Sequence, residues 1–270
     1  MGFSILHKEN IPYLLAQNLR GHKGMMHAFT TRLGGVSKDK YTSLNLALHV
    51  GDNPEDVVSN RVKVAALFGA DLDDCVTMRQ VHGIHVQKIF LGDKGLGARV
   101  YDDSVYEADA LVTDQPGILL WCLVADCVPV LLYDPKRRVI AATHAGWRGT
   151  LGRISGETIK VMVEDYGCAP ENILAAIGPS AGPCCFVVDG EVADLFMAAG
   201  FKDIVVPFGD KYKLDLWQAN RQAIIEMDVP EKNISTSGLC TSCLTELFFS
   251  FRAEEGVTGR FAATIMLQDL

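Results

Sequence analysis

Residues 140–150 read IAATHAGWRGT, and this stretch decides the fold class. Its first part is a run of small and apolar residues that is typical of a buried strand. The strand ends on His144, and the chain then passes through a glycine-bracketed Trp-Arg pair into an expected helix over 151–166. A buried strand followed directly by a helix favours a sheet-centred α/β or α+β protein. His144 is therefore either a packing residue or one corner of a site at the end of this strand.

The rest of the chain supports the same class, with mixed central sheets flanked by helices. A helix is expected after Pro54, where apolar residues recur at helical spacing at Val58, Val62, Ala65 and Phe68. No linker rich in proline or serine divides the chain, so we expect one domain over 1–270. Further helices are expected near 190–199 and 215–227, and strands at 25–31, 75–81, 84–90, 109–113, 118–125, 129–133, 173–177, 234–236 and in the FFSF and FAATIML segments.

The composition of the chain limits the classes of partner that we expect it to bind. The 270 residues carry a formal charge of −8, which argues against binding along a nucleic-acid backbone. No apolar run is long enough to cross a bilayer, and the N-terminus lacks a secretory signal. Eight cysteines in a chain of this size then indicate reduced thiols and a cytoplasmic location. We expect a small-molecule substrate, with no nucleic acid and no membrane as partner.

Two other expected strands also end on a residue that can bind a metal. His82 lies in RQVHG (79–83), and Cys127 lies in WCLVADCVP (121–129). Together with His144 they make two imidazoles and one thiolate, a set that suits Zn²⁺ and leaves a fourth position for water or substrate. Each residue taken singly is more often a packing residue, and their spacing matches no short zinc motif. The set is a hypothesis that needs further support.

That support comes from a resemblance carried by eight motifs in order. They are SLNL (43–46), RQVHG (79–83), EADALVTD (107–114), ADCVPVLLYD (125–134), THAGWRGT (143–150), IGPSAGPCCF (177–186), GLCT (238–241) and FFSFR with TGR (248–260). Together they resemble the YfiH family, also called peptidoglycan editing factor, whose members carry the names multicopper polyphenol oxidase (laccase) and purine nucleoside phosphorylase. The resemblance covers nearly the whole chain.

The resemblance implies a fold, a metal and an activity. The fold is an α/β single domain grouped with cysteine-hydrolase-like toxins, and the metal is Zn²⁺ on His82, Cys127 and His144. The activity is phosphorolysis of adenosine, guanosine, inosine or methylthioadenosine, and deamination of adenosine. The chain departs from the family pattern at two places. Phe186 and Val187 stand where the family has Tyr and Glu, and Ala253 stands where it has a second Arg.

The expected roles follow from that activity. Zn²⁺ activates a water for deamination, whereas phosphate attacks the ribose in phosphorolysis. Arg148, beside a helix expected to begin near Thr150, is placed to hold the phosphate. Asn45 and Arg32 are polar substrate contacts, although an Asn in such a loop is more often a turn residue. Asp126, beside Cys127, either orients a ligand or substrate or caps a turn.

Three alternatives remain open. The first is polyphenol oxidation with copper in place of zinc, which is disfavoured because the chain has seven histidines and no His-x-His pair. The second is a cysteine hydrolase that edits a cell-wall precursor such as a UDP-muramyl-amino acid, with Cys127 as nucleophile activated by His82 or His144. The third is a non-catalytic zinc protein whose fourth ligand is Cys122, His85 or a member of the Cys240–Cys243 pair.

The Cys240–Cys243 pair has the spacing of a zinc or redox motif. The chain holds no second pair at that spacing. Because thiols are usually buried, we interpret the two residues as structural.

Overall fold

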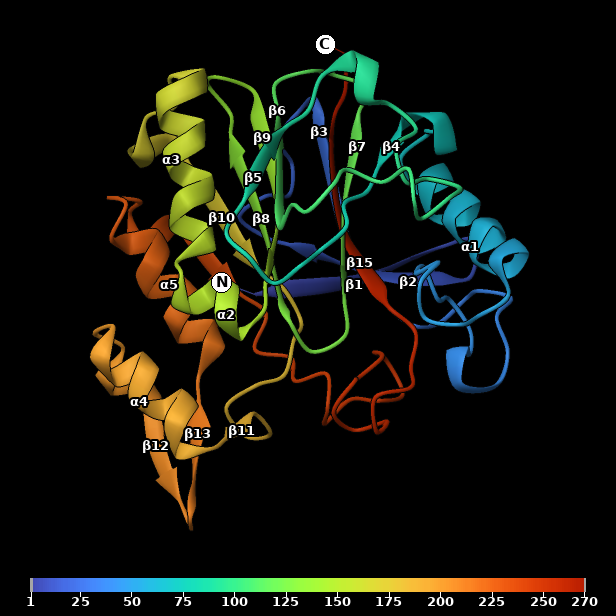
Figure 1. Cartoon of the computed structure of the whole chain (residues 1–270). Coiled ribbons are helices and arrows are strands. Elements are labelled where there is room, and N and C mark those ends of the chain that lie inside the picture. The colour runs from blue at the N-terminus through green and yellow to red at the C-terminus, as the bar shows by residue number, and fades with distance from the viewer. Residues whose placement is uncertain (1, 270) are drawn as a thin grey trace.

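Two six-stranded sheets pack face to face in the computed structural model, which describes residues 2–269 (Figure 1). Each sheet mixes parallel and antiparallel pairs, as expected. The first sheet has the order β1 (Phe3–Lys8), β2 (Ile11–Ala16), β3 (Met25–Thr30), β15 (Phe261–Leu267), β7 (Leu119–Val124) and β4 (Cys75–Val76). The second has the order β14 (Ile234–Thr236), β10 (Leu174–Ile177), β8 (Val128–Asp134), β9 (Val139–Ala145), β6 (Ala110–Thr113) and β5 (Val86–Lys88).

The helices cover the outer faces of the two sheets (Figure 1). Against the first sheet lies α1 (Pro54–Leu67), and against the second lie α3 (Ile154–Tyr166) and α5 (Leu216–Ile225). The short α2 (Trp147–Leu151) connects β9 to α3. A third sheet, of β11 (Val187–Val188), β13 (Lys211–Leu214) and β12 (Val205–Phe208), lies beside α4 (Gly190–Ala198). The fold class is therefore the expected one.

The central strands are apolar on both faces because both faces are covered. In β7, Leu120 and Cys122 point into the core between the sheets, whereas Leu119 and Trp121 point toward α1. This division follows from the two-residue period of a strand. A strand buried on both sides shows a continuous apolar run rather than an alternation, which explains why such runs mark the centre of this fold.

Several element predictions need correction. The expected strand at 75–81 is reduced to β4, and the FFSF segment lies outside any strand. The expected helix over 151–166 begins earlier, at Trp147, and is interrupted before α3 by Arg153, whose φ of 59° is left-handed. In α1, Val62 is 51% exposed, because the buried face runs through Val57 and Arg61 instead. Within residues 2–269, every helix is too short or too polar to cross a membrane.

Strand register brings the three expected ligands to one end of the second sheet. The antiparallel pairing of β8 with β9 places Pro129 opposite His144, so Cys127, two residues before Pro129, lies just beyond the histidine. The segment 125–127 is also the corner at which the chain crosses from β7 in one sheet to β8 in the other. The loop that carries His82 precedes β5, at the edge of the same sheet.

Candidate metal centre and active site

His82, Cys127 and His144 lie together, as the sequence predicts. Their ligand atoms all lie within 4.8 Å of one another. The Cys127 Sγ is 3.8 Å from the His82 Nε2, and the two imidazole rings meet edge to face at 4.9 Å between centroids. His144 is buried, Cys127 is partly buried and His82 is exposed, so the group opens toward solvent on the His82 side. Two nitrogens and one sulfur at this separation are a donor set that fits Zn²⁺.

No further side chain closes this group in the part of the chain that the structure describes. Cys122, His85 and the Cys240–Cys243 pair, the expected sources of a fourth ligand, are not among the donors within 4.8 Å. Cys122 points into the core between the sheets, and the His85 ring contacts the backbone oxygen of Glu107 instead. Three protein ligands and one free position are the arrangement of a catalytic rather than a structural zinc site.

Asp109 is the residue of this centre that the sequence did not reveal. Its buried carboxylate accepts a hydrogen bond from His144 Nδ1 at 2.7 Å. It also accepts backbone N–H bonds from His82 at 3.0 Å and Gly83 at 2.6 Å, and this turn includes the left-handed φ of 62° at His82. One carboxylate therefore fixes the ring of one ligand and the backbone of another, which is the usual task of the residue behind a metal-binding histidine.

The charges in this centre favour a thiolate. Burial alone would raise the pKa of the Cys127 thiol, but His144 and His82 beside it lower that pKa to about 6. Burial alone would lower the pKa of His144, but the Cys127 sulfur and the Asp109 carboxylate raise it to about 9. The pKa of Asp109 is held below its ordinary value, because the hydrogen bonds from His144 and the backbone outweigh its burial. At neutral pH, these shifts favour a Cys127 thiolate beside a His144 imidazolium when no metal is bound, and thiolate is the form of cysteine that binds metals.

Close packing explains why a glycine stands at position 146, after His144 and Ala145. A Cβ at this position would lie 2.5 Å from His82 Cδ2 and 3.4 Å from Cys127 Sγ. The backbone φ of −66° is ordinary, so the constraint comes from close approach and not from conformation. The chain passes directly over two of the three ligands, and only glycine fits there.

A cavity of about 330 Å³ lies over the three ligands, which are part of its lining. This volume is within the range of small-molecule sites. Apolar and aromatic side chains form much of the wall, and three arginines, Arg148, Arg252 and Arg260, add positive charge. The remaining lining residues are His49, Met78, Gln80, Tyr101, Leu123, Val124, Ala125, Asp126, Trp147, Phe186, Leu216 and Phe251.

Of the expected polar contacts, Arg148 lies at this cavity. It is exposed, and its guanidinium stacks on the Trp147 ring at 4.2 Å. Arg148 belongs to the first turn of α2, because the helix begins at Trp147 and not near Thr150. The expected phosphate site combined Arg148 with the N-terminus of a long helix. Because α2 has only five residues, Arg148 is the part of that site that remains.

Asp126 lines the cavity, but its carboxylate is occupied within the protein. It accepts hydrogen bonds from Thr241 Oγ1 and from the Arg252 backbone N–H, each at 2.6 Å. Asp126 has a left-handed φ of 84° and is 7% exposed. The side chain thus ties the β7–β8 corner to the segment that carries Arg252, which favours the turn-capping alternative over substrate orientation.

The structure does not bring Asn45 and Arg32 to the cavity. Asn45 is fully buried, and its amide bonds to Asp52 and Ala47 while its oxygen accepts the Arg260 backbone N–H. Arg32 forms an ion pair with Glu254 at 2.9 Å. Both residues support the loops behind the cavity and lie outside its lining.

Comparison with known proteins identifies the family. The model of the family described as multi-copper polyphenol oxidoreductase laccase matches residues 26–268. The chain belongs to this family, the YfiH family of the sequence resemblance. It is 40% identical over 246 residues to the purine nucleoside phosphorylase YlmD of Geobacillus stearothermophilus, covering 90% of each chain. It is 38% identical over 232 residues to adenosine deaminase RL5 from an unknown prokaryotic organism, covering 84% of this chain and 88% of the relative.

A solved structure of the YfiH family matches the fold throughout. The hypothetical protein YfiH of Bacillus licheniformis superimposes with a TM-score of 0.93 at 36% identity, over 98% of this chain and 99% of that one. The sheets and helices that carry His82, Cys127 and His144 therefore follow the architecture of this YfiH protein.

The positions at which the sequence is expected to depart from the family pattern lie at or near the cavity. Phe186 lines the cavity, and the Arg252 guanidinium stacks over its ring at 4.8 Å. Val187 begins β11, and its carbonyl accepts a hydrogen bond from Arg252. Ala253 is exposed and follows Arg252 directly. The wall at this side is therefore an aromatic ring held by an arginine, without a hydroxyl or a carboxylate from positions 186 and 187.

His49, Arg252 and Arg260 are cavity residues that sequence reasoning did not select. The two arginines lie in the FFSFR and TGR motifs, which were the only signal for them. His49 gives no such signal in LALHVGD (46–52), and only the fold brings it to the cavity. Burial and the nearby cations Arg260 and Arg61 lower the pKa of His49 to about 4, so this ring is neutral at physiological pH.

Proposed function

We propose that this YfiH member is a zinc-dependent purine nucleoside enzyme that cleaves adenosine, guanosine, inosine or methylthioadenosine with phosphate and deaminates adenosine. The observation that carries the proposal is the open group of His82, Cys127 and His144 at a cavity of about 330 Å³. Relatives that share about two fifths of its residues carry the names purine nucleoside phosphorylase and adenosine deaminase. We place it in the cytoplasm, where its eight free thiols stay reduced.

The residues present fit a catalytic zinc. Asp109 holds His144 by Nδ1, which leaves the Nε2 of that ring for the metal, and the lowered pKa of Cys127 supplies a thiolate. Zn²⁺ held there would provide a Lewis acid and activate water near neutral pH. Zinc is favoured over copper because a multicopper centre needs more imidazoles than the two gathered here.

The cavity wall suits a nucleoside and phosphate. Phe186 and Trp147 offer aromatic surface to a purine, and the three cavity arginines offer positive charge to phosphate. In phosphorolysis, a phosphate oxygen bonds to the ribose C1′ as the bond from C1′ to the base breaks, and the base leaves with a proton. In deamination, a water oxygen bonds to C6 of adenine and ammonia leaves. Arg148 and Arg252 are both exposed at the cavity, and Arg148 is proposed to hold the phosphate.

Product analysis tests this proposal directly. The zinc-loaded protein is incubated with adenosine, guanosine, inosine and methylthioadenosine, with and without phosphate, and the products are separated by chromatography. We expect free base only when phosphate is present, and inosine from adenosine in either condition. The proposal would be overturned if none of the four nucleosides were converted.

A second candidate function rests on one specific arrangement. Asp109, His144 and Cys127 form a carboxylate–imidazole–thiol series, and the lowered pKa of Cys127 makes its thiolate a nucleophile. This series would serve a cysteine hydrolase acting on a cell-wall precursor such as a UDP-muramyl-amino acid. Cys127 would form a bond to the substrate carbonyl carbon, the leaving amine would take a proton from His144, and water would release the acyl group.

His82 separates the two candidates, because zinc binding needs it and the thiol–imidazole–carboxylate series does not. We expect His82→Ala to lose the zinc held with Cys127 and His144, and all nucleoside turnover. His85→Ala, three residues along the same loop, is the matched control and should keep both. If His82→Ala has lost this zinc and is still active, the cysteine mechanism replaces the zinc mechanism.

A further inference from the structure

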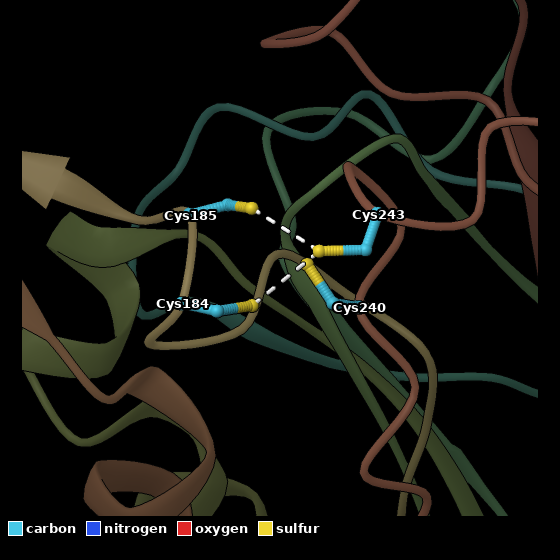
Figure 2. A group of neighbouring side chains, drawn as sticks. All are labelled: Cys184, Cys185, Cys240 and Cys243. Carbon is cyan, nitrogen blue, oxygen red and sulfur yellow. Dashed lines mark hydrogen bonds between the residues drawn. The ribbon is translucent and has the colours of Figure 1, made fainter.

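Four cysteines from two distant segments meet at a second place in the structure. Cys184 and Cys185 lie in the loop between β10 and β11, and Cys240 and Cys243 lie in the loop after β14. Figure 2 shows the side chains of the two pairs pointing toward one another. All four sulfurs lie within 4.8 Å of one another, with Cys243 at 3.6 Å from Cys184 and 3.4 Å from Cys185. The sequence holds no second pair of cysteines at Cys-x-x-Cys spacing. In the structure, the adjacent residues Cys184 and Cys185 lie beside the Cys240–Cys243 pair instead.

The backbone holds the two loops in this position. Ser180 and Cys240 form a parallel bridge, in which the Ser180 N–H donates to Leu239 and the Thr241 N–H donates to Ser180. Each loop then turns tightly at its cysteines, through hydrogen bonds from Cys185 N–H to the Gly182 carbonyl and from Cys243 N–H to the Cys240 carbonyl. The cluster is therefore built on backbone contacts that do not depend on the sulfurs.

The sulfur positions match a metal better than disulfides. Four thiolates around one Zn²⁺, each at about 2.3 Å, lie about 3.8 Å apart at the corners of a tetrahedron. A disulfide needs sulfurs at about 2.05 Å, whereas the two close pairs lie 3.4 and 3.6 Å apart. The Gly182 N–H also donates to the Cys240 sulfur at 3.3 Å, a contact of the kind that supports metal-bound ligands.

The exposure of the four cysteines also favours a bound metal. Cys240 is buried, but Cys184 and Cys243 are exposed and Cys185 is partly exposed. The burial on which the structural interpretation of the Cys240–Cys243 pair rested is therefore found at Cys240 and not at Cys243. Free surface thiols are prone to oxidation, and a cluster of them is unfavourable unless something binds it. We propose that Cys184, Cys185, Cys240 and Cys243 bind a second Zn²⁺ in a closed four-thiolate site.

This site has a structural task and no open position for chemistry. It joins the loop that carries Phe186 to the loop whose Thr241 donates to Asp126. Phe186 follows Cys185 directly and lines the cavity, so a metal here would hold one wall of the proposed active site in place. The proposal is independent of what the His82, Cys127 and His144 group binds.

Metal content tests the proposal. The chain is purified under reducing, oxygen-free conditions, and zinc per chain is measured for the unchanged protein and for Cys184→Ser with Cys243→Ser. We expect the double variant to hold one zinc fewer than the unchanged protein. Cys168→Ala, which changes a buried cysteine outside both groups, is the control and should lose none. Equal zinc in the double variant and the unchanged protein, or iron in place of zinc, would overturn the proposal.

A second measurement leaves the four cysteines intact and so does not depend on the folding of the double variant. X-ray absorption at the zinc edge is recorded on Cys127→Ala, which removes a ligand of the other group. We expect the remaining zinc to have four sulfur neighbours at about 2.3 Å. Zinc bound mainly by nitrogen or oxygen, or disulfides among the four cysteines in the reduced preparation, would contradict the site.

Discussion

The Nδ1 of His144 donates a hydrogen bond to the Oδ1 of Asp109 across 2.7 Å, in a position shielded from solvent. The same carboxylate accepts the backbone N–H groups of His82 and Gly83. Two ligands that are far apart in the sequence are therefore oriented by one buried residue. Because a ring fixed at Nδ1 can bind a metal only through Nε2, this contact sets the direction from which His144 reaches the centre.

The first prediction concerns this carboxylate. Asp109→Asn should weaken zinc binding about 10- to 100-fold, because the amide no longer stabilises the His144 ring and the turn at His82 as a charge does. Nucleoside turnover at limiting zinc should fall by a similar factor. Zinc affinity measured with a competing chelator checks this. Asp102→Asn is the control, since Asp102 is exposed and forms an ion pair with Arg79. Unchanged affinity in Asp109→Asn would show that the carboxylate does not orient the ligands.

The second prediction concerns the glycine that passes over the ligands. Gly146→Ala would place a methyl group 2.5 Å from the His82 ring, so the ring must move away from Cys127. We expect weaker zinc binding and at least tenfold lower turnover in a chain that remains folded. Gly92→Ala is the matched control, because its new methyl group would meet no atom within 4 Å. Normal zinc affinity in Gly146→Ala would contradict this close approach.

The third prediction is a pH dependence in the metal-free chain. Because His144 and His82 lower the pKa of Cys127 to about 6, its thiolate should persist at neutral pH and be lost as the pH falls through about 6. Alkylation of Cys127 by iodoacetamide, followed site by site with mass spectrometry, should show a midpoint at about 6. An ordinary cysteine would have its midpoint near 8.5.

Two comparisons complete this test. Cys122 should stay unreactive, because burial raises its pKa well above the ordinary value and the side chain is enclosed. Added Zn²⁺ should protect Cys127, since the sulfur would then be a ligand. A Cys127 midpoint close to that of an ordinary cysteine would refute the thiolate–imidazolium pair.

The fourth prediction concerns Asp126, whose carboxylate accepts hydrogen bonds from Thr241 and from the Arg252 backbone. Asp126→Ala should lower the free energy of unfolding by about 2–4 kcal/mol, because it removes a nearly buried carboxylate and leaves the Thr241 hydroxyl and the Arg252 N–H without their acceptor. Denaturant unfolding measures this, with the exposed Asp210→Ala as control. A stable Asp126→Ala protein with a raised KM alone would instead identify Asp126 as a substrate contact.

Much of the central fold follows from the sequence, and the reason is burial. The strands ending at His144 and before Cys127 are apolar on both faces, so their runs mark the centre of the two sheets. The edges were harder to predict. The strand expected at 75–81 is mostly irregular. In FFSF, Phe248 and Phe249 are buried without strand pairing, whereas Phe251 is exposed. Apolar content indicates burial, but it does not distinguish a strand from a packed loop.

The candidate site, like the fold, could be predicted from the sequence only in part. His82, Cys127 and His144 are residues whose chemistry stands out in a sequence, and the structure brings them together. Asp109 lies in EADALVTD without any local feature to distinguish it, and only the pairing of β6 with β9 places it behind His144. Asn45 illustrates the opposite case, because a polar residue in a motif proves to be fully buried support.

Removal and return of the metal tests the central claim most directly. The chain is stripped of metal with a chelator under reducing conditions, and conversion of adenosine, with and without phosphate, is measured before and after Zn²⁺ is added. We predict no conversion by the stripped chain, recovery with Zn²⁺ and no recovery in His82→Ala. Full conversion by the metal-free chain would contradict the zinc mechanism.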